Sequence, residues 1–280
     1  MSLNSVNTNT GAMIALQNLN ATNSEINTVQ NEISTGLKVA SPQDDGATWS
    51  IAQSQRAQVM SLDSINDSLN RGLSATDVAM TAGQTVSDLL LQMKQKALSA
   101  SDTSLDATSR AALNSDFQSL RDQITQVVSN ADFNGTNLIN AGAKNYNALA
   151  NASGTSTITV LAEDLSLGGA NLTGIAATAT IGSVTVATAM VATITTDINN
   201  VSAALANLGT GANALQTQLT FTGKLQDTLN TGIGNLVDAD LAQASAQLQA
   251  LQTKQQLGVQ SLSIANSSSS NLLGLFRNIQ

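Results

Sequence analysis

The sequence contains no cysteine and no histidine among its 280 residues. These absences exclude disulfide bonds, thiolate chemistry, zinc sites built from thiolate or imidazole ligands, and catalysis with histidine as the base. Aromatic residues make up only 2% of the chain, so its apolar side chains are mainly Leu, Ile, Val and Ala, which suit close packing between helices. The single proline is Pro42, and beyond it no residue forces a helix to kink.

Charge is also scarce, and most of it is negative. The formal net charge is −8, which argues against binding to a phosphate backbone as the main task. No apolar run reaches the ~18 residues that indicate a membrane-spanning helix. The first basic residue is Lys38, so we expect no Sec signal peptide at the N-terminus. We therefore expect no cofactor, no nucleic acid and no membrane as partners, and a chain that is either soluble or exported by another signal.

The strongest pattern in the sequence is a stripe of apolar residues between Ile194 and Leu236. They recur at alternating steps of four and three, interrupted only by Thr222 and Gln226, which is typical of a long helix with one apolar face. At about 1.5 Å per residue the helix would be roughly 65 Å long, so it requires partner helices of similar length. Its stripe residues are Ile194, Ile198, Val201, Leu205, Leu208, Ala212, Leu215, Leu219, Leu229, Ile233 and Leu236.

Both ends of the chain carry similar stripes with almost no charge. In the first 37 residues only Glu25 and Glu32 are charged, and in the last 40 only Lys254 and Arg277. An exposed coiled coil normally places Glu and Lys beside its seam, whereas Gln, Asn, Ser and Thr stand there in this chain. The pattern favours stacking of identical copies, because a charge would repel its own duplicate; a flexible polar tail is the alternative. Under either interpretation the ends should be largely disordered in a single molecule.

The two terminal stripes form the candidate assembly interface. The N-terminal helix is expected from about Ser5 to Leu37, with Asn23 at one stripe position, and Gln255 holds a stripe position near the C-terminus. The interface residues are Leu16, Leu19, Ile26, Ile33 and Leu37 at one end, and Leu241, Leu248, Leu251, Leu262, Leu272, Leu273, Leu275 and Phe276 at the other.

The middle of the chain has a different character. From Arg56 to Lys144 charges of both signs are present, as on an ordinary solvated surface. One helix is expected from about Val59 to Ala100, with small stripe residues that permit close approach, and another between Leu113 and Val127. Together with the helix over 194–236 they predict a three-helix core that folds alone. Between Ala148 and Met190, the short β-favouring runs 157–161 and 183–186 predict a small β-rich excursion.

The junction between the neutral N-terminal end and the charged middle contains a helix-start signal. Ser41 is expected as the N-cap, Pro42 as the first helical residue and Asp44 in the first turn. Asp44 and Asp45 have no third ligand nearby, so we expect neither a metal site nor a catalytic site. At the downstream junction, residues 232–240, the stripe steps by an extra four residues, which predicts a stutter.

The order of several short motifs resembles bacterial flagellin over nearly the whole chain. Near the N-terminus the motifs are 5–9 (SVNTN) and 34–39 (STGLKV), and near the C-terminus 271–277 (NLLGLFR). Phe133, Asn134 and Gly135 resemble the family's Phe-Asn-Gly turn. Each motif is weak alone, but their order and their placement at both termini are specific.

This resemblance implies a mainly α fold: a long antiparallel helical bundle or coiled coil from the paired N- and C-terminal ends, with a small β-rich outer excursion. The implied domains are 1–40 with 237–280 as the inner coiled coil, 41–56 as a linker, 57–147 with 191–236 as the helical middle, and 148–190 outside. The linker residues Ser41, Pro42, Asp44 and Asp45 and the turn Phe133–Gly135 are the implied spoke and turn positions.

The implied function is a structural subunit that self-polymerises into the extracellular flagellar filament for swimming motility. The chain would leave the cell unfolded through the flagellar type III export apparatus, without a cleaved signal. Implied partners are further copies of itself, the hook–filament junction proteins, the filament cap, and an export chaperone that binds roughly Leu241 to Gln280.

Two other functions are compatible with flagellin-like ends. A hook–filament junction protein would cap the filament rather than extend it, and a secreted coiled-coil effector or adhesin would act on host surfaces. An enzyme is disfavoured because no acid, base or nucleophile is assembled in the sequence. With no histidine, the outer segment also lacks the HExxH site that some flagellins insert there.

Overall fold

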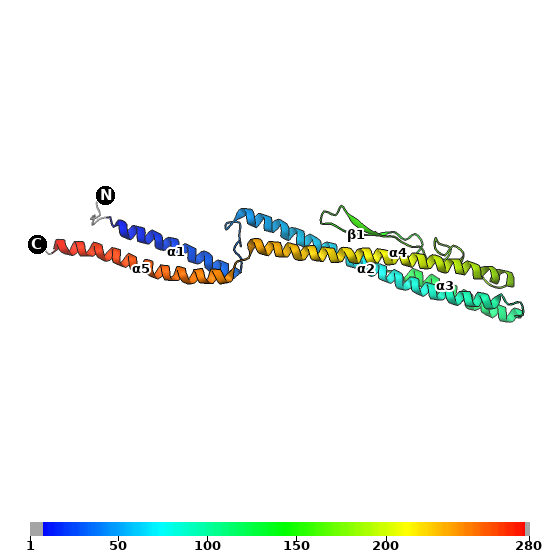
Figure 1. Cartoon of the computed structure of the whole chain (residues 1–280). Coiled ribbons are helices and arrows are strands. Elements are labelled where there is room, and N and C mark those ends of the chain that lie inside the picture. Colours follow the sequence, from blue (N-terminus) through cyan, green and yellow to red (C-terminus); the bar gives the residue numbers. More distant parts are fainter. Residues whose placement is uncertain (1–7, 278–280) are drawn as a thin grey trace. The chain divides into compact units, whose positions relative to one another are not determined.

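The computed structural model describes the backbone of residues 8–277 and the side chains of residues 8–267. In chain order its elements are α1 (Thr10–Thr35), α2 (Gly46–Ala100), α3 (Ala107–Asn130), β1 (Tyr146–Leu149), β2 (Thr157–Val160), α4 (Val184–Val237) and α5 (Leu241–Arg277) (Figure 1). The expected mainly α fold with one small sheet is confirmed. The chain divides into two compact units, one formed by the two ends up to Ala57 and from Thr228 onward, the other by 58–227.

In the unit formed by the chain ends, α1 and α5 lie side by side and antiparallel, although they come from opposite ends of the chain (Figure 1). We call this pair of helices the α1–α5 hairpin. Asn9 caps α1 by accepting a hydrogen bond from the Ala12 N–H, and Gly36 ends the helix at φ 70°, a conformation that glycine adopts without strain. Asp240 caps α5 by accepting from the Ala242 and Gln243 N–H groups. The hairpin core consists of Ile26, Val29, Ala244 and Leu251, with Ile33 and Leu248 packed against it.

The upstream junction differs from the expected helix start. Residues 41–44 form a turn, and α2 begins only at Gly46. Asp45, rather than Ser41, caps this helix, because its Oδ1 accepts from the Ala47 and Thr48 N–H groups. The prediction failed because proline fits position i+1 of a turn as well as it fits the first turn of a helix.

The downstream junction is a break between two helices instead of the expected stutter. The helix α4 ends at Val237 and α5 begins at Leu241. Between them a backbone bridge joins Leu37 and Asp238, and the Lys38 N–H donates to the Val237 carbonyl at 2.7 Å. The extra step of the stripe therefore marks a change of helix.

In the unit formed by 58–227, the helices α2, α3 and α4 all contribute to the buried core. Met93, Phe117 and Ile194 supply fully buried side chains from the three helices in turn. The expected close approach at small residues is present, because a Cβ at Gly83 would lie 2.7 Å from the Leu205 Cδ2. Where the α4 stripe is interrupted, Thr222 is buried and the Gln226 Nε2 donates to the Asp63 Oδ1 at 2.7 Å.

The excursion between α3 and α4 contains less β-structure than expected. Within the run at 157–161, residues Thr157–Val160 form β2, which pairs antiparallel with β1 so that Tyr146 lies opposite Val160. The run at 183–186 was wrongly expected to be a strand, because α4 already begins at Val184. Ala187 and Ile194, one heptad apart, are both fully buried, so packing of this face overrides the β propensity of the Val and Thr residues.

Candidate assembly interface

The terminal stripe residues are brought together within one chain along the α1–α5 hairpin. Ile26 and Leu251 are buried in its core, and Ile33 and Leu248 lie against them. Further along, Leu19 lies 3.3 Å from the position of a Cβ at Gly258. Leu37 and Leu262 are half-buried. These stripe residues therefore hold the hairpin itself together.

Two other members of the stripe remain open to solvent. Leu16 is 47% exposed and Leu241 is 48% exposed, so they stay available to a neighbouring molecule. Four further members, all in α5, lie outside the residues whose side chains the structure describes: Leu272, Leu273, Leu275 and Phe276.

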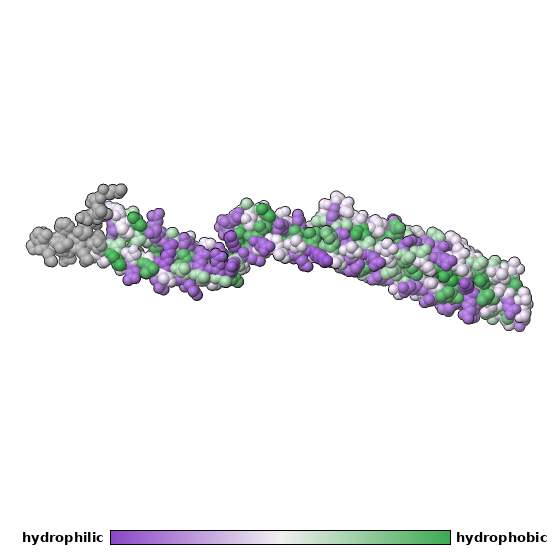
Figure 2. Space-filling view, in the orientation of Figure 1, coloured by the Kyte–Doolittle hydropathy of each residue, from purple (hydrophilic) through white to green (hydrophobic). Residues whose placement is uncertain are grey.

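A second set of apolar residues lies on the outside of the hairpin, and Figure 2 shows apolar surface over both helices. On α1, Ile14 is 60% exposed, and on α5, Leu257 and Ile264 are 62% and 63% exposed. They share the end of the hairpin at which Gly11 faces Ala265 and Leu19 faces Gly258. We call this set the outer apolar set; its members are Met13, Ile14, Leu16, Leu257, Val259 and Ile264.

Most of the outer apolar set was missed from the sequence, because Met13, Ile14, Leu257, Val259 and Ile264 are not stripe residues. The signal that could have revealed them is apolar residues outside the stripe on helices that carry almost no charge. Single exposed apolar residues are normal on a protein surface, but a grouped set indicates an interaction site. The hairpin thus buries one stripe and leaves further apolar side chains exposed at one of its ends.

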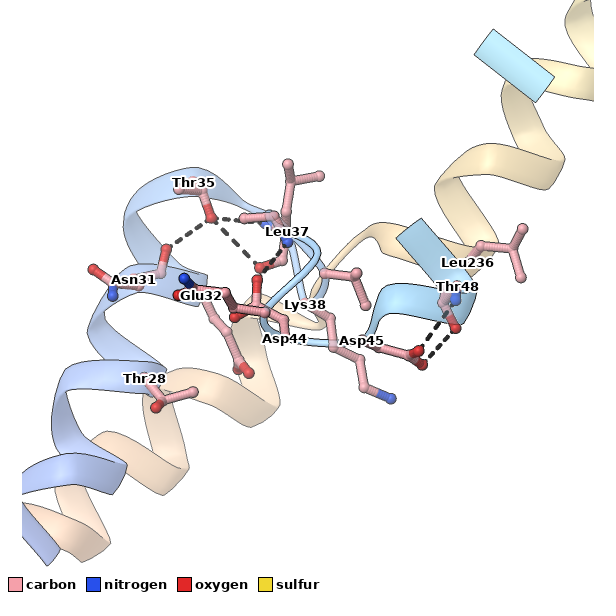
Figure 3. Close-up of a pocket in the computed structure, with 13 residues that line it drawn as sticks. Thr28, Asn31, Glu32, Thr35, Leu37, Lys38, Asp44, Asp45, Thr48 and Leu236 are labelled. Atoms are coloured by element: carbon pink, nitrogen blue, oxygen red, sulfur yellow. Dashed lines mark hydrogen bonds between the residues drawn. The ribbon is translucent and has the colours of Figure 1, made fainter. Parts of the chain in front are cut away.

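The turn that precedes α2 uses the Asp44 carboxylate to fix its backbone (Figure 3). The Asp44 Oδ2 accepts hydrogen bonds from the Ala40 N–H, from the Ser41 N–H at 2.8 Å and from the Ser41 hydroxyl. The bonds from Ser41 are the main reason why the pKa of Asp44 lies below its usual value. Pro42 lies in the same turn.

Asp45 caps the first turn of α2 beside it. Its Oδ2 accepts from the Thr48 hydroxyl at 2.6 Å, and this bond, followed by the bond from the Thr48 N–H, lowers the pKa of Asp45. A cavity of about 550 Å³ is open next to these residues, with Glu32 and Lys38 also in its lining. Among the described residues no group of three His, Cys, Asp or Glu side chains is placed to hold a metal ion. The two aspartates thus serve the local fold.

The turn Phe133–Gly135 belongs to the other unit and is a tight hairpin turn. Asn134 and Gly135 adopt φ values of 52° and 79°, which asparagine and glycine tolerate best. The Phe133 and Thr136 backbones exchange two hydrogen bonds of 2.9 and 3.0 Å, and Asp132 accepts from the Gly135 N–H. The turn at 41–45, by contrast, lies in the unit formed by the chain ends.

These features define a class of protein before any relative is considered. In the described part of the chain, no helix is long and apolar enough to cross a membrane. The helices are paired through apolar seams, and the terminal hairpin displays a further apolar set. The fold and the candidate site are those of a helical structural protein that associates with other molecules.

Comparisons with known proteins identify the family. The profile of the bacterial flagellin N-terminal helical region matches residues 6–144, and that of the bacterial flagellin C-terminal helical region matches residues 191–276. Flagellin FljM of Caulobacter vibrioides is 55% identical over 277 residues, covering 99% of this chain and 100% of that protein. A flagellin of Brucella melitensis is 36% identical, covering 98% of this chain and 99% of that protein.

The crystal structure of a Bacillus cereus flagellin is also similar, with 22% sequence identity and a TM-score of 0.48, covering 54% of this chain and 86% of that chain. By its profile matches and its relatives, the chain belongs to the bacterial flagellin family. It is accordingly a structural subunit of the flagellar filament rather than an enzyme. Motility and the flagellar export route are typical of such proteins.

Proposed function

We propose that the α1–α5 hairpin is the part of the chain through which copies polymerise. The contact residues are the outer apolar set and the exposed stripe residue Leu241, while the buried stripe residues hold the hairpin together. The observation that carries this proposal is the grouping of exposed Ile14, Leu257 and Ile264 on a hairpin with almost no charge. Burial of such side chains stabilises an assembly by roughly 25 cal/mol per Å² of apolar area. The absence of charge avoids self-repulsion between identical copies.

In this proposal, residues 1–40 and 237–280 form the inner core of the filament, and 41–56 connect it to a helical middle made of 57–147 and 191–236. Residues 148–190 face outward. The turns at 41–45 and 133–135 set the path of the chain between these parts. Support comes from the contrast between the neutral ends and the charged middle.

The proposed partners during export and growth are the export apparatus, a chaperone on 241–280, the hook–filament junction proteins and the filament cap. The chain would be exported unfolded without a cleaved signal, which agrees with the lack of a basic residue before Lys38. Mass spectrometry of protein recovered from filaments tests this directly. The expected mass is that of the full chain, with or without Met1, and a larger N-terminal loss would contradict it.

The assembly proposal is tested by removing the exposed apolar side chains without touching the hairpin core. The variant combines Ile14→Gln, Leu257→Gln and Ile264→Gln, and the matched control is Leu161→Gln, an exposed leucine of the excursion in the other unit. We expect the triple variant to lose growth on sheared filament seeds by at least about tenfold, as burial worth more than 1.4 kcal/mol is lost. The control should grow normally.

Two outcomes would contradict the proposal. One is normal filament growth by the triple variant. The other is long filaments from a chain truncated before Leu241, which should instead remain a folded, soluble monomer. Growth that stops after one layer on the seeds would indicate a junction protein instead of a filament subunit.

A further inference from the structure

The α1–α5 hairpin contains one pair of amide side chains at the level where its apolar seam is interrupted. Asn23 and Gln255 occupy stripe positions, and the Gln255 Nε2 donates a hydrogen bond of 2.7 Å to the Asn23 Oδ1. Both side chains are half-buried. They lie between the apolar cluster around Ile26 and the contact of Leu19 with Gly258.

We propose that this amide pair is a register lock: it selects one alignment of α1 against α5 and penalises alignments shifted by a heptad. The inference rests on the proposed function, because the hairpin is the module through which copies would polymerise. A subunit with a shifted hairpin would present its outer apolar set at the wrong height to its neighbours. A single polar pair within an apolar seam is a known way to specify register at some cost in stability.

The heptad spacing of the α5 leucines alone does not select the alignment. Leu248, Gln255 and Leu262 are spaced by seven residues, so a shift of α5 by one heptad in either direction still brings a stripe residue opposite Asn23. Hydrogen bonds within each helix do not depend on register. The Glu25–Lys254 ion pair, at 3.7 Å, is exposed on both sides and such pairs contribute little.

The backbone bridge between Leu37 and Asp238 holds the junction end of the hairpin. It lies in the connecting segments beyond the helix ends, so it aligns the junction and not the seam at the level of Asn23. In a shifted alignment, by contrast, Asn23 would face Leu248 or Leu262 inside the seam and lose its partner. An amide left without a partner in an apolar seam retains its desolvation cost. The amide pair therefore distinguishes the alignments where the leucines do not.

The alignment can be read with cysteine pairs, since the chain has no cysteine of its own. A Cβ at Gly11 lies 3.9 Å from the Ala265 Cβ, and one at Gly258 lies 4.0 Å from the Leu19 Cβ, both within the ~3.5–4.5 Å range of disulfides. The native reporters are thus Gly11→Cys with Ala265→Cys, and Leu19→Cys with Gly258→Cys. The same positions can also be combined in the other way. A disulfide between Leu19→Cys and Ala265→Cys forms only when α5 is shifted by one heptad in one direction, and a disulfide between Gly11→Cys and Gly258→Cys only when it is shifted by one heptad in the other.

The test variant is Asn23→Leu with Gln255→Leu, which replaces the amide pair by apolar side chains. The matched control is Asn23→Gln with Gln255→Asn, which exchanges the two amides and keeps the pair. In the native and exchanged chains, intramolecular disulfides at the native reporters should exceed those at the shifted reporters by roughly tenfold or more. In the double-leucine chain this ratio should fall by about the same factor, while far-UV circular dichroism shows no loss of helix.

The ratio is measured on the monomer band of a non-reducing gel, both for polymerised protein and for monomer in an excluded osmolyte, which favours the folded hairpin. An unchanged ratio in the double-leucine chain would overturn the register lock. So would equal disulfide yields at native and shifted reporters in the native chain. Electron microscopy measures filament formation separately. A wild-type chain that forms no filaments would contradict the proposed function. The ratio of native to shifted disulfides, measured on the monomer in the osmolyte, would still decide whether the amide pair sets the register.

Discussion

Asp44 and Asp45 are adjacent in the chain, yet their carboxylates fix different parts of the backbone. Asp44 closes the turn at Ser41, and Asp45 caps α2 at Thr48. From the sequence, both were correctly placed at the junction, but Ser41 was assigned as the cap that Asp45 provides. Ser41 and Asp45 are both good N-cap residues, and only the path of the chain decides between them.

The first prediction concerns the stability of this junction in acid. Hydrogen bonds lower the pKa of both carboxyl groups from the usual 3.8, so their stabilising effect is complete above that value and is lost as the pH falls through the lower, folded-state pKa. Fluorescence of Trp49, the only tryptophan, should report the loss in an acid titration of assembled protein. The variant Asp44→Asn with Asp45→Asn should shift or flatten this transition, and an unchanged transition would contradict the assignment.

Asp197 predicts the opposite pH dependence in the other unit. It is 1% exposed, its Oδ1 accepts from the Gly174 N–H at 3.3 Å, and its Oδ2 has no hydrogen-bond partner in the described structure. Burial raises the pKa of Asp197, and the hydrogen bonds from the Gly174 and Ile175 backbone lower it by less. Because the folded-state pKa lies above the usual 3.8, ionisation of Asp197 destabilises this unit as the pH rises above that value.

The free energy of unfolding of the monomer, measured in urea between pH 4 and pH 7, tests this effect. Asp197→Asn retains an acceptor for Gly174 and removes the charge, so the variant should gain stability relative to the native chain as the pH rises. The control is Asp88→Asn, an exposed aspartate of α2, which should leave the slope unchanged. A native slope that persists in Asp197→Asn would contradict the role of this group.

Arg110 is a buried cation whose guanidinium closes the connection between α2 and α3. It donates to the carbonyl oxygens of Ala100, Asp102 and Leu105. Replacement by methionine leaves these carbonyls without that donor and should lower the free energy of unfolding by about 3 kcal/mol. Urea denaturation followed by circular dichroism measures it. Arg71→Met, at an exposed position of α2, should change stability by less than about 0.5 kcal/mol.

At the scale of elements, stripe periodicity was sufficient to predict the helices but not their ends. The stripe from Ile194 to Leu236 corresponds to most of α4, and that from Leu113 to Val127 lies within α3. The N-terminal turns of α4 were misassigned because Val184 and Val186 favour strands when considered alone. The partner of β2 was not recognised, because Tyr146–Leu149 has only one fully buried residue, Ala148, and no alternating pattern.

Close packing within the 58–227 unit gives the prediction at this scale. A Cβ at Gly72 would lie 2.6 Å from the Tyr146 ring, whose hydroxyl donates to the Ser68 carbonyl at 3.0 Å. Gly72→Ala should therefore cost about 1–3 kcal/mol through overpacking. Gly209→Ala is the matched control, because nothing lies within 4 Å of its Cβ position, and it should stabilise α4 by up to about 1 kcal/mol. Equal effects at the two glycines would contradict the packing described.

At the scale of the whole molecule, motifs at both termini indicated the family. The contrast between neutral ends and a charged middle predicts a division of roles that the filament-growth experiment tests. The outer apolar set on α1 and α5 could not be predicted in the same way. Apolar periodicity identifies the residues through which two helices pair. It does not show that Ile14 and Leu257 are exposed, because their exposure depends on where the seam between α1 and α5 lies. The same applies to Asn23 and Gln255. In the sequence they are polar interruptions of the stripe, and only the structure shows that they form a hydrogen bond with each other.

The central claim is that the α1–α5 hairpin gains stable order only when other copies cover its apolar surface. Amide hydrogen exchange, compared between dilute monomer and filament, tests this most directly. The expected result is fast exchange of 10–35 and 241–277 in the monomer, slow exchange of the buried helices of the 58–227 unit in both samples, and strong protection of the terminal helices only in the filament. Terminal helices that are already as protected in the dilute monomer as in the filament would contradict the account.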